Sequence, residues 1–481
     1  MDTTIVRRGL KRPWIVVVTG AILIALFSLL WVQFVEGLRL PAYSLVLPIA
    51  GVVVAVAIMR WPWLGIYLSL VTVPVEVGLV YVAGFGMYVF QPLVMLTTVS
   101  LLGRSISGSG KVLVPRRLWP VMGLWLAYVF SAFFAIDMET TLGGIVYFIP
   151  LLALCWIFAK EIRSAVARQR IMDGALWTGL LFALIGLIQL GAYYSGFIIA
   201  LGPRQASFLI LYGRPSGLQG EPDWFGIYIG MILAMAIPLW IRKEGLFRHR
   251  VATLLVVILG VAVLVSGTRS AWMGLLVAGG LYFWIAQRQV ARKVAALLGF
   301  GFLLAAVLLA LALVAPRVLE PLNRMQYLFD PSEHNSAVRV NTWVQALEYI
   351  RLRPIVGYGL SAWEVLAPQV QESTGFIIIG GKSVPNIFLE NWLSAGLPGL
   401  VLTIVFCAYY IYHLWRSLRT TAGYHGRAYL ESALMGFVMV LVASFFTNAF
   451  KHNWFWLMVA LIVAVLNTFN VDHSVHSIGR A

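Results

Sequence analysis

The sequence is poor in charged residues. Only 11% of its 481 residues are Asp, Glu, Lys or Arg, whereas 61% are hydrophobic. Soluble domains carry roughly a quarter charged residues, so this composition excludes a soluble globular protein. The mean hydropathy of +0.88 indicates an integral membrane protein instead.

Residues that commonly form disulfides or hold metals are also scarce. The two cysteines, Cys155 and Cys407, lie inside apolar stretches and predict core packing without a disulfide framework. The sequence has neither a His-Glu-x-x-His motif nor a Cys-x-x-Cys pair. The Gly-Ser-Gly-Lys stretch at 108–111 lacks the upstream glycine and the following Ser or Thr of a phosphate loop. We therefore expect neither a metal nor a cofactor.

Acidic residues number 19 against 35 basic ones, which gives a net charge of +16. A nucleic-acid-binding protein would carry a basic run on a soluble domain, and the sequence shows no such domain. Cytoplasmic loops of membrane proteins collect Lys and Arg. The excess therefore predicts a membrane topology with lipids as neighbours and no nucleic-acid partner. The basic N-terminus precedes a long apolar run without a small-residue cleavage site, which predicts an uncleaved first span.

Apolar segments long enough to cross a membrane recur along the chain. A span needs roughly 20 apolar residues, and about fourteen segments qualify or nearly qualify. We predict an all-α polytopic membrane protein with about 12–14 transmembrane helices. The segments begin near Trp14, Ala42, Trp63, Met87, Leu118, Gly144, Met172, Trp224, Val251, Ala271, Val294, Ile387, Tyr429 and Trp454.

The distribution of basic residues gives an independent test of these spans. With the N-terminus in the cytoplasm and the spans alternating, every basic cluster falls on the inner side, as the positive-inside rule requires. The C-terminus is then cytoplasmic as well. The inner clusters contain Arg60, Arg104, Lys111, Arg116, Arg117, Lys160, Arg163, Arg168, Arg170, Arg242, Lys243, Arg248, Arg250, Arg288, Arg292, Lys293, Arg416, Arg419 and Arg427.

One connector, residues 316–385, is much longer than the others and lies outside by alternation. It carries six basic and six acidic residues, and long translocated loops are not governed by the Lys/Arg bias. Apolar residues recur in it at helical spacing and predict an amphipathic helix that lies on the outer surface or caps a cavity. The chain thus divides into transmembrane helices over 1–315, this extracytoplasmic loop, and C-terminal transmembrane helices over 386–481. The apolar residues are Val340, Trp343, Val344, Leu347 and Ile350.

Three arginines are predicted to lie on this outer face. Arg214 precedes a span, Arg269 lies in a Ser-Gly-Thr-Arg-Ser turn between two spans, and Arg339 lies in the long loop. A planar guanidinium binds phosphate oxygens in bidentate fashion and stays charged at any relevant pH. Each arginine alone is open to a second interpretation, snorkelling to lipid headgroups. Three on one face favour binding of a diphosphate.

Acidic residues and one histidine near the same face are candidates for chemistry on a second substrate. Glu221 is a candidate general base or an orienter of an acceptor hydroxyl, whereas Asp223 is expected to cap a helix N-terminus. Glu390 lies one turn inside the span that follows the loop and is a further candidate. His334 is the only histidine of the long loop, where a lone histidine is more often surface decoration than a catalyst.

The roles of Glu76 and of the last outer connector are less defined. Glu76 lies within a span, where acidic residues are functional by default, but the sequence does not name its partner. Lys451, His452 and Asn453 form the last outer connector and are interpreted as interfacial.

The order of the motifs resembles the O-antigen ligase and Wzy-type O-antigen polymerase superfamily of bacterial envelope glycan transferases. The resemblance covers roughly residues 214–400, and each motif alone is weakly specific. The motifs are Arg214-x-x-Gly217 followed by Glu221-Pro222, Ser266 to Ser270, Arg339-x-x-x-Trp343, Pro354 to Gly359, Pro385 to Glu390, and Ala395 to Gly399.

The resemblance implies a GT-C-like, inverting and metal-independent glycosyltransferase of the bacterial plasma membrane. Its donor would be an undecaprenyl-diphosphate-linked glycan at the outer face, and its acceptor another glycan or a lipid-linked molecule. The product would be a polysaccharide of the O-antigen, lipopolysaccharide or exopolysaccharide type. Carried over by position, Arg214 and Arg269 would hold the donor diphosphate, with Arg339 assisting from the loop.

The chain departs from the family at the end of the loop. Ligases of the family carry a histidine just before the asparagine there, and this chain has Pro385. The departure favours a polymerase or another envelope glycan transferase over a ligase onto the lipid A core. Glu221, His334 or Glu390 would then fill the role, unless no strong base is needed. The sugar, the linkage and the choice between polymerase and ligase stay open.

The alternative is a transporter of a solute such as bicarbonate, a function linked to some members of the same superfamily. Transporters tend to show inverted repeats and polar breaks at mid-membrane, and the sequence shows neither.

Overall fold

The computed structural model describes residues 43–76, 79–82, 85–107, 115–248, 252–285, 334–375, 383–421 and 426–478. The spans predicted near Trp14 and Val294 lie outside these residues. The described α-helices are α3 (Tyr43–Arg60), α4 (Pro62–Thr72), α5 (Phe90–Ser107), α6 (Trp119–Ser131), α7 (Met138–Glu161), α8 (Ala165–Tyr194), α9 (Pro203–Tyr212), α10 (Pro222–Arg242), α11 (Thr253–Ser266), α12 (Arg269–Ile285), α14 (His334–Leu352), α15 (Trp363–Thr374), α16 (Ile387–Thr420), α17 (Arg427–Ala443) and α18 (Asn453–Ile478).

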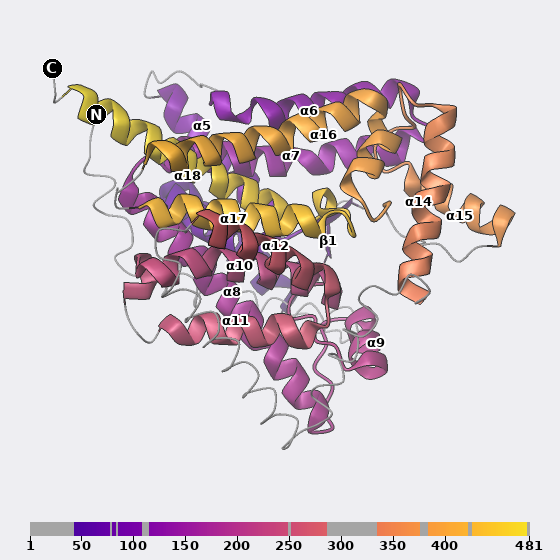
Figure 1. The fold of residues 1–481 in the computed structure, drawn as a ribbon, viewed down its shortest axis with the longest axis horizontal. Helices are drawn as coiled ribbons and strands as arrows, with labels where there is room; N and C mark the ends of the chain where they lie inside the picture. Colours follow the sequence, from indigo (N-terminus) through magenta and orange to yellow (C-terminus); the bar gives the residue numbers. More distant parts are fainter. Residues whose placement is uncertain are drawn as a thin grey trace.

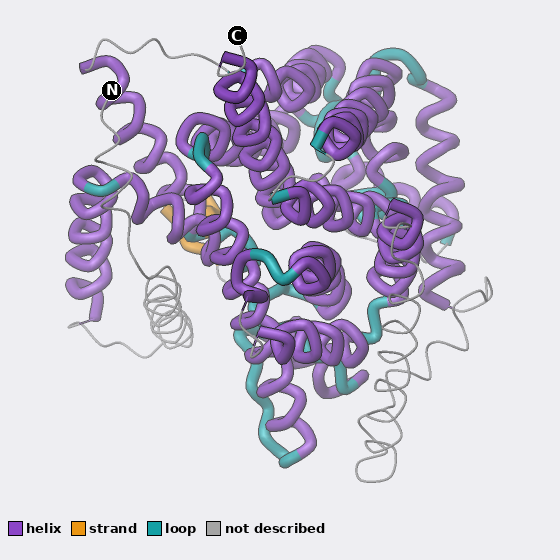
Figure 2. Tube along the Cα trace, turned by 60° about the vertical axis from the view of Figure 1, so that its left-hand side comes forward, coloured by secondary structure: helices purple, strands orange, loops and turns teal. Residues whose placement is uncertain are grey.

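The long helices lie side by side in a bundle, with α9, α14 and α15 at one end of it (Figure 1). This confirms the predicted all-α polytopic membrane fold. A short antiparallel hairpin of β1 (Leu79–Val82) and β2 (Phe85–Tyr88), orange in Figure 2, precedes α5 and was not predicted. Within the described residues, five segments are long and apolar enough to cross a membrane: Arg116–Phe134, Met138–Glu161, Ala165–Tyr194, Pro222–Arg248 and Ile387–Thr420.

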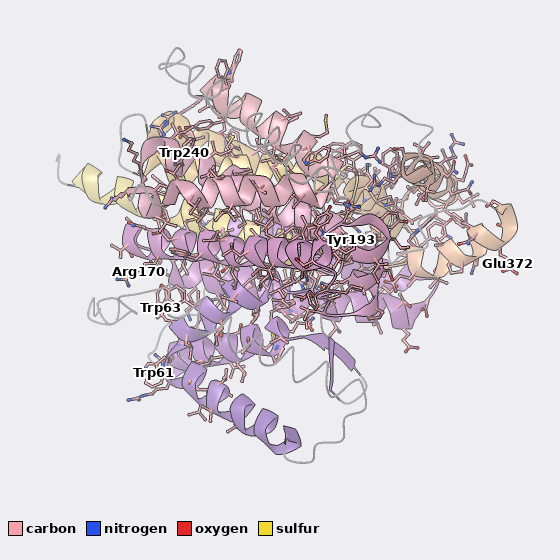
Figure 3. The ribbon with its side chains drawn as sticks, turned by 90° about the horizontal axis from the view of Figure 1, so that it is seen from below. Trp61, Trp63, Arg170, Tyr193, Trp240 and Glu372 are labelled. Carbon is pink, nitrogen blue, oxygen red and sulfur yellow. The ribbon has the colours of Figure 1, made fainter. Side chains whose placement is uncertain are left out.

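The two ends of the bundle differ in character. Arg170 and Trp240 lie toward one end, whereas Tyr193 and Glu372 lie toward the other (Figure 3). At the first end the buried carboxylate of Glu431 accepts hydrogen bonds from Arg242 (2.6 Å) and Arg427 (2.9 Å). Arg242 of α10 and Arg427 of α17 therefore share one carboxylate at this end of the bundle. Its assignment to the cytoplasm stays a prediction.

Helix α10 is the most buried of the five spans and packs against α11, α12 and α17. Its first turns carry Gly226, where a Cβ atom would overlap the side chains of Ser266 and Thr268. A glycine at this position lets the turn between α11 and α12 approach the backbone of α10 closely. The N-terminus of α10 and the Ser-Gly-Thr-Arg-Ser turn are thereby held together.

Helix α16 is kinked at Ala395 and Gly396, and the loop segment 354–359 fills the kink. Gly396 has a φ of +63°, a conformation that favours glycine. The Leu397 N–H donates to the Pro354 carbonyl at 2.9 Å, and the Leu393 carbonyl accepts from the Tyr358 N–H at 2.9 Å. The loop thus satisfies backbone groups that the kink frees. Two of the motifs that carried the family resemblance therefore form one structural joint.

The helix predicted in the long loop corresponds to α14, and most of its apolar residues named above are not buried in the protein. Val340, Val344 and Leu347 are 44%, 47% and 37% exposed, whereas Ile350 is buried. The buried positions of α14 are Thr342, Ala346 and Ile350. Helix α14 packs against α16, and Ala346 and Ile350 belong to one apolar cluster with Leu393 of α16.

Candidate functional site

The loop that carries Arg214 is buried and held by a glutamine of α8. The Gln189 side-chain oxygen accepts hydrogen bonds from the Ser216 N–H (3.2 Å) and the Gly217 N–H (2.8 Å). Its amide nitrogen donates to the Gly217 carbonyl at 3.1 Å. A loop that is fixed in this way presents Arg214 in one orientation.

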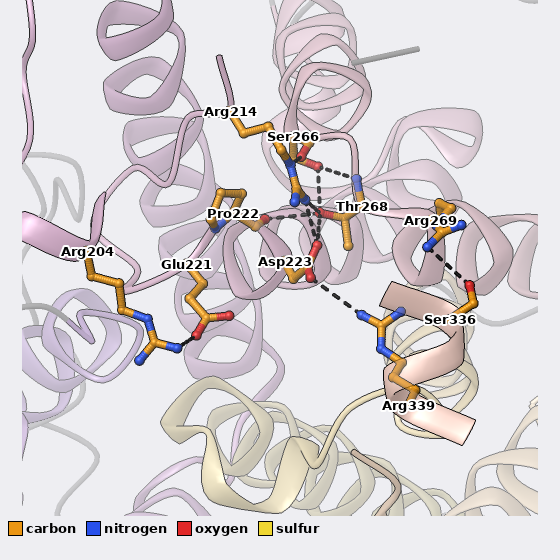
Figure 4. Close-up of polar contacts among 10 residues, drawn as sticks. All are labelled: Arg204, Arg214, Glu221, Pro222, Asp223, Ser266, Thr268, Arg269, Ser336 and Arg339. Carbon is orange, nitrogen blue, oxygen red and sulfur yellow. Dashed lines mark hydrogen bonds and ion pairs between the residues drawn. The ribbon is translucent and has the colours of Figure 1, made fainter. Parts of the chain in front are cut away.

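The Arg214 guanidinium joins the ends of two helices. Its Nε donates to the carbonyl of Ser266, the last residue of α11, at 2.7 Å, and its Nη2 donates to Asp223 Oδ1 at 2.6 Å (Figure 4). A carbonyl at a helix C-terminus carries partial negative charge, which favours a cation there. Only 5% of the Arg214 side chain is exposed, so this arginine is a fixed part of the framework.

Asp223 holds a second arginine from the long loop. It lies in the first turn of α10, where a carboxylate is favoured by the helix dipole. Its Oδ2 lies 3.6 Å from Nη2 of Arg339 on α14 (Figure 4). Glu221, and not Asp223, is the N-cap residue of α10. Asp223 therefore has a role beyond the expected helix end, since one carboxylate links Arg214 to Arg339.

Arg269 is the first residue of α12 and also reaches α14. Its Nη2 donates to the Ser336 hydroxyl at 3.5 Å (Figure 4). The three arginines predicted to share one face thus lie at the same end of the bundle, around α14. Arg269 is half-buried, and 24% of the Arg339 side chain is exposed. These two guanidinium groups are more accessible than that of Arg214.

Glu221 is paired with an arginine that the sequence analysis did not select. Its carboxylate forms an ion pair with Arg204 of α9 (Figure 4), and 16% of the Glu221 side chain is exposed. Burial raises the pKa of the Glu221 carboxyl, and the positive charge of Arg204 opposes this rise. The Arg204 guanidinium also lies over the Trp224 ring, 5.6 Å from its centroid. In the sequence, Arg204 lies in a predicted outer connector shortly before Arg214, and this position was the available signal that it belongs to the site.

Glu390 anchors the end of the long loop. One carboxylate oxygen accepts from the Val384 N–H at 2.7 Å, and the other accepts from the Ser394 hydroxyl at 3.5 Å. The residue is 1% exposed. His334 is the first residue of α14, and its side chain lies outside the described part of the structure. Neither residue is therefore placed against the arginines by a described contact.

Pro385, which stands where ligases of the family carry a histidine, has a structural role. The Pro385 carbonyl accepts a hydrogen bond from the Trp343 indole of α14 at 3.3 Å. The next residue, Asn386, caps α16 by accepting from the Phe388 and Leu389 N–H groups at 2.9 and 3.1 Å. Residues 385–386 thus connect the loop helix to the start of α16.

A buried His–carboxylate pair lies beside this cluster and was missed. Nδ1 of His452 lies 3.2 and 3.1 Å from the two carboxylate oxygens of Glu76. The Asn453 N–H donates to the same carboxylate at 3.2 Å. His452 is only 8% exposed, so its interpretation as an interfacial residue is wrong. The sequence analysis singled out Glu76 as an acidic residue within a predicted span. It did not identify His452 as the partner, because the two residues are 376 positions apart in the chain.

The described residues offer no obvious metal site. Within the described ranges, no three His, Cys, Asp or Glu side chains gather closely enough to hold a metal ion. The positive charge at this end of the bundle comes from guanidinium groups instead.

Residues 254–404 match the family model of the O-antigen ligase. Over these residues the chain is similar to the O-antigen ligase family. The match confirms the resemblance seen in the order of the motifs. The matched part contains Arg269, Arg339 and Glu390. Arg214 and Glu221 precede it, and Arg214 contacts it at Ser266. No curated protein matches the chain.

The family match and the fold support a membrane enzyme of the O-antigen ligase or polymerase type, and this family implies a lipid-linked glycan and an acceptor as partners.

Proposed function

We propose that this enzyme transfers a glycan from an undecaprenyl-diphosphate carrier at the outer face of the bacterial plasma membrane. The glycan is polymerised or ligated to an acceptor, with inversion and without a metal. The arrangement that carries the proposal is the pair Arg269 and Arg339, which flank α14 at one end of the bundle with Asp223 behind them. Asp223 pairs with Arg214 and Arg339, whereas Arg269 reaches Ser336 on the same helix as Arg339.

The chemistry needs a way to neutralise the leaving diphosphate. When the bond between the sugar C1 and the diphosphate oxygen breaks, the electron pair remains on the diphosphate. Fixed guanidinium groups can stabilise this charge without reorganising and can bind two oxygens at once. In this proposal Arg269 and Arg339 contact the diphosphate, and the more buried Arg214 positions Asp223 and the α11–α12 turn.

In the proposal, the long loop positions Arg339. Arg339 and Ser336 both lie on α14, which is fixed to α16 through the Trp343–Pro385 hydrogen bond. The loop helix thereby sets the distance between Arg339 and the arginine at the start of α12. Glu390 supports this position by holding Val384, and we assign it to positioning.

The proposal is tested by Arg269→Ala in a strain whose chromosomal copy has been deleted. We expect the variant to insert normally, long-chain glycan to disappear, and undecaprenyl-linked units to accumulate. Arg351→Ala is the matched control, because Arg351 lies on α14 with 75% of its side chain exposed and pairs only with its helix neighbour Glu348 in the described structure. Glycan of normal length in the Arg269→Ala strain, at equal protein level, would refute the proposal.

A further inference from the structure

The Glu76–His452 pair has the arrangement of a proton acceptor held by a carboxylate. Nδ1 of His452 faces both oxygens of Glu76. A carboxylate at Nδ1 fixes the proton on that nitrogen and leaves a lone pair on Nε2. The described residues give Nε2 no hydrogen-bond partner, and 10% of the side chain is exposed. Nε2 is therefore available to a group from outside the chain.

The imidazole ring is held in one orientation by its aromatic neighbours. The Trp454 ring stacks on it at 5.2 Å and 9°, and the Trp224 ring lies against it at 4.5 Å and 55°. Asn453 supports the pair from the backbone and also bonds the Tyr147 hydroxyl through its side chain. A ring clamped in this way loses little further freedom on catalysis.

The pair is adjacent to the arginine cluster. Trp224 follows Asp223 in the first turn of α10, and its ring contacts both His452 and the guanidinium of Arg204. The Glu76 N–H donates to the Leu218 carbonyl at 3.1 Å, within the loop that carries Arg214. Trp224 and the loop that carries Arg214 thus join the Glu76–His452 pair to the arginine cluster.

We propose that Nε2 of His452 accepts the proton of the acceptor hydroxyl and that Glu76 is its positioning residue. This inference rests on the proposed glycosyl transfer. The acceptor oxygen forms a bond to the sugar C1 while the C1–diphosphate bond breaks. The hydroxyl proton moves to Nε2, the electron pair of the broken bond leaves with the diphosphate, and the imidazolium then returns its proton to water.

The other candidate bases are less suited. Both oxygens of Glu390 accept hydrogen bonds from the chain itself, and the residue is 1% exposed. The Glu221 carboxylate is engaged by Arg204. An ion-paired carboxylate is a weaker proton acceptor than a neutral imidazole. Glu221 instead suits an acceptor-orienting role.

Several charged groups lie near His452. Glu76 contacts it directly, and His452 is one of the charged neighbours of the Glu221 carboxyl, together with Arg204, Asp223 and Arg214. Lys451, the preceding residue, is paired with Glu364 of α15 at 3.3 Å. The closest of these groups to His452 is the Glu76 carboxylate, which orients the ring through Nδ1.

The test uses the purified full-length protein in nanodiscs, with undecaprenyl diphosphate as a binding probe. Turnover is measured with lipid-linked glycan extracted from the deletion strain. His452→Asn keeps an amide N–H that can bond Glu76 but removes Nε2. His413→Asn on α16 is the matched control, since this half-buried histidine packs against Tyr409 and Tyr412, away from the cluster.

We expect His452→Asn to bind undecaprenyl diphosphate like the wild type and to lose about 100- to 10,000-fold in turnover. Glu76→Gln should also keep undecaprenyl diphosphate binding and lose turnover, because a neutral amide no longer fixes the proton on Nδ1.

Turnover of His452→Asn within about threefold of the wild type would overturn the inference. An inactive Glu221→Gln protein beside a His452→Asn protein that stays active would overturn it as well. If the His452→Asn protein does not fold and insert, Glu76→Gln decides, and wild-type turnover of that variant counts against the pair. A wild-type protein that neither binds undecaprenyl diphosphate nor extends glycan would instead refute the proposed function.

Discussion

Replacing Arg214 and Arg339 separately by glutamine should distinguish a framework arginine from a substrate-binding one. Both contact Asp223, but at 2.6 and 3.6 Å, and the Arg214 side chain is 5% exposed against 24% for Arg339. Arg214→Gln removes a charged hydrogen bond worth roughly 1.5–3 kcal/mol and a bond to the Ser266 carbonyl worth about 1 kcal/mol. Because Asp223 is one-third exposed, solvent recovers part of this loss.

The two variants should therefore differ in stability but agree in function. We expect Arg214→Gln to cost about 2–4 kcal/mol and Arg339→Gln roughly 0–1 kcal/mol. At about 2 °C per kcal/mol for a long chain, the first variant melts roughly 4–8 °C lower, and the second within about 2 °C of the wild type. Both should abolish long-chain glycan.

Thermal unfolding followed by tryptophan fluorescence, in one detergent and at one protein concentration, measures the difference. The complemented deletion strain supplies the glycan profile for each variant. An Arg339→Gln protein that melts as low as Arg214→Gln would show that the contact to α14 is structural. An Arg214→Gln protein of wild-type stability would refute the interpretation that the buried contacts of Arg214 stabilise the fold.

Two further substitutions test the positioning parts of the site. Gly396→Ala should destabilise the kink, because φ is +63° and a Cβ would overlap the Ile355 carbonyl. Faster proteolytic cleavage within residues 354–385 would report this destabilisation. Gly279→Ala on α12, where a Cβ would meet open space, is the control and should show no change. Glu390→Gln should keep at least about a third of the activity, whereas Glu390→Ala should lose stability because it leaves the buried Val384 N–H unpaired. An inactive but stable Glu390→Gln would return Glu390 to the list of catalytic candidates.

The helices were predictable from the sequence because apolar length is a local property. The spans predicted to begin near Trp224 and Ile387 correspond to α10 and α16, which begin at Pro222 and Ile387. The Pro at the first position of α10 and the Asn before α16 are ordinary start signals of helices. The hairpin before α5 gave no comparable signal, since its two strands are only four residues each.

The buried face of α14 was not predictable from its own pattern. Val340, Val344 and Leu347 are the more hydrophobic residues, yet they are exposed. Ala346 and Ile350 are buried instead, in one apolar cluster with Leu393 of the partner helix α16. The choice between two faces of one helix depends on a neighbour that is remote in sequence.

The common location of the three arginines followed from topology alone, but their division of labour did not. Alternation of spans places Arg214, Arg269 and Arg339 on one side. Only the fold shows that Arg214 binds the end of α11 and that Asp223 serves two arginines. Exposure, which separates framework from substrate contact, is a property of the packed structure.

The location of the family match bears on the two halves of the proposed site. The donor residues Arg269 and Arg339 lie within the matched residues 254–404, whereas Glu76, Glu221 and His452 all lie outside. A carrier diphosphate is chemically the same whichever glycan it bears, so one set of guanidinium groups can serve many enzymes. Acceptors differ in structure, and their recognition needs residues that differ too. The site then does not need a histidine in place of Pro385, because His452, directly before α18, accepts the proton in the proposed mechanism.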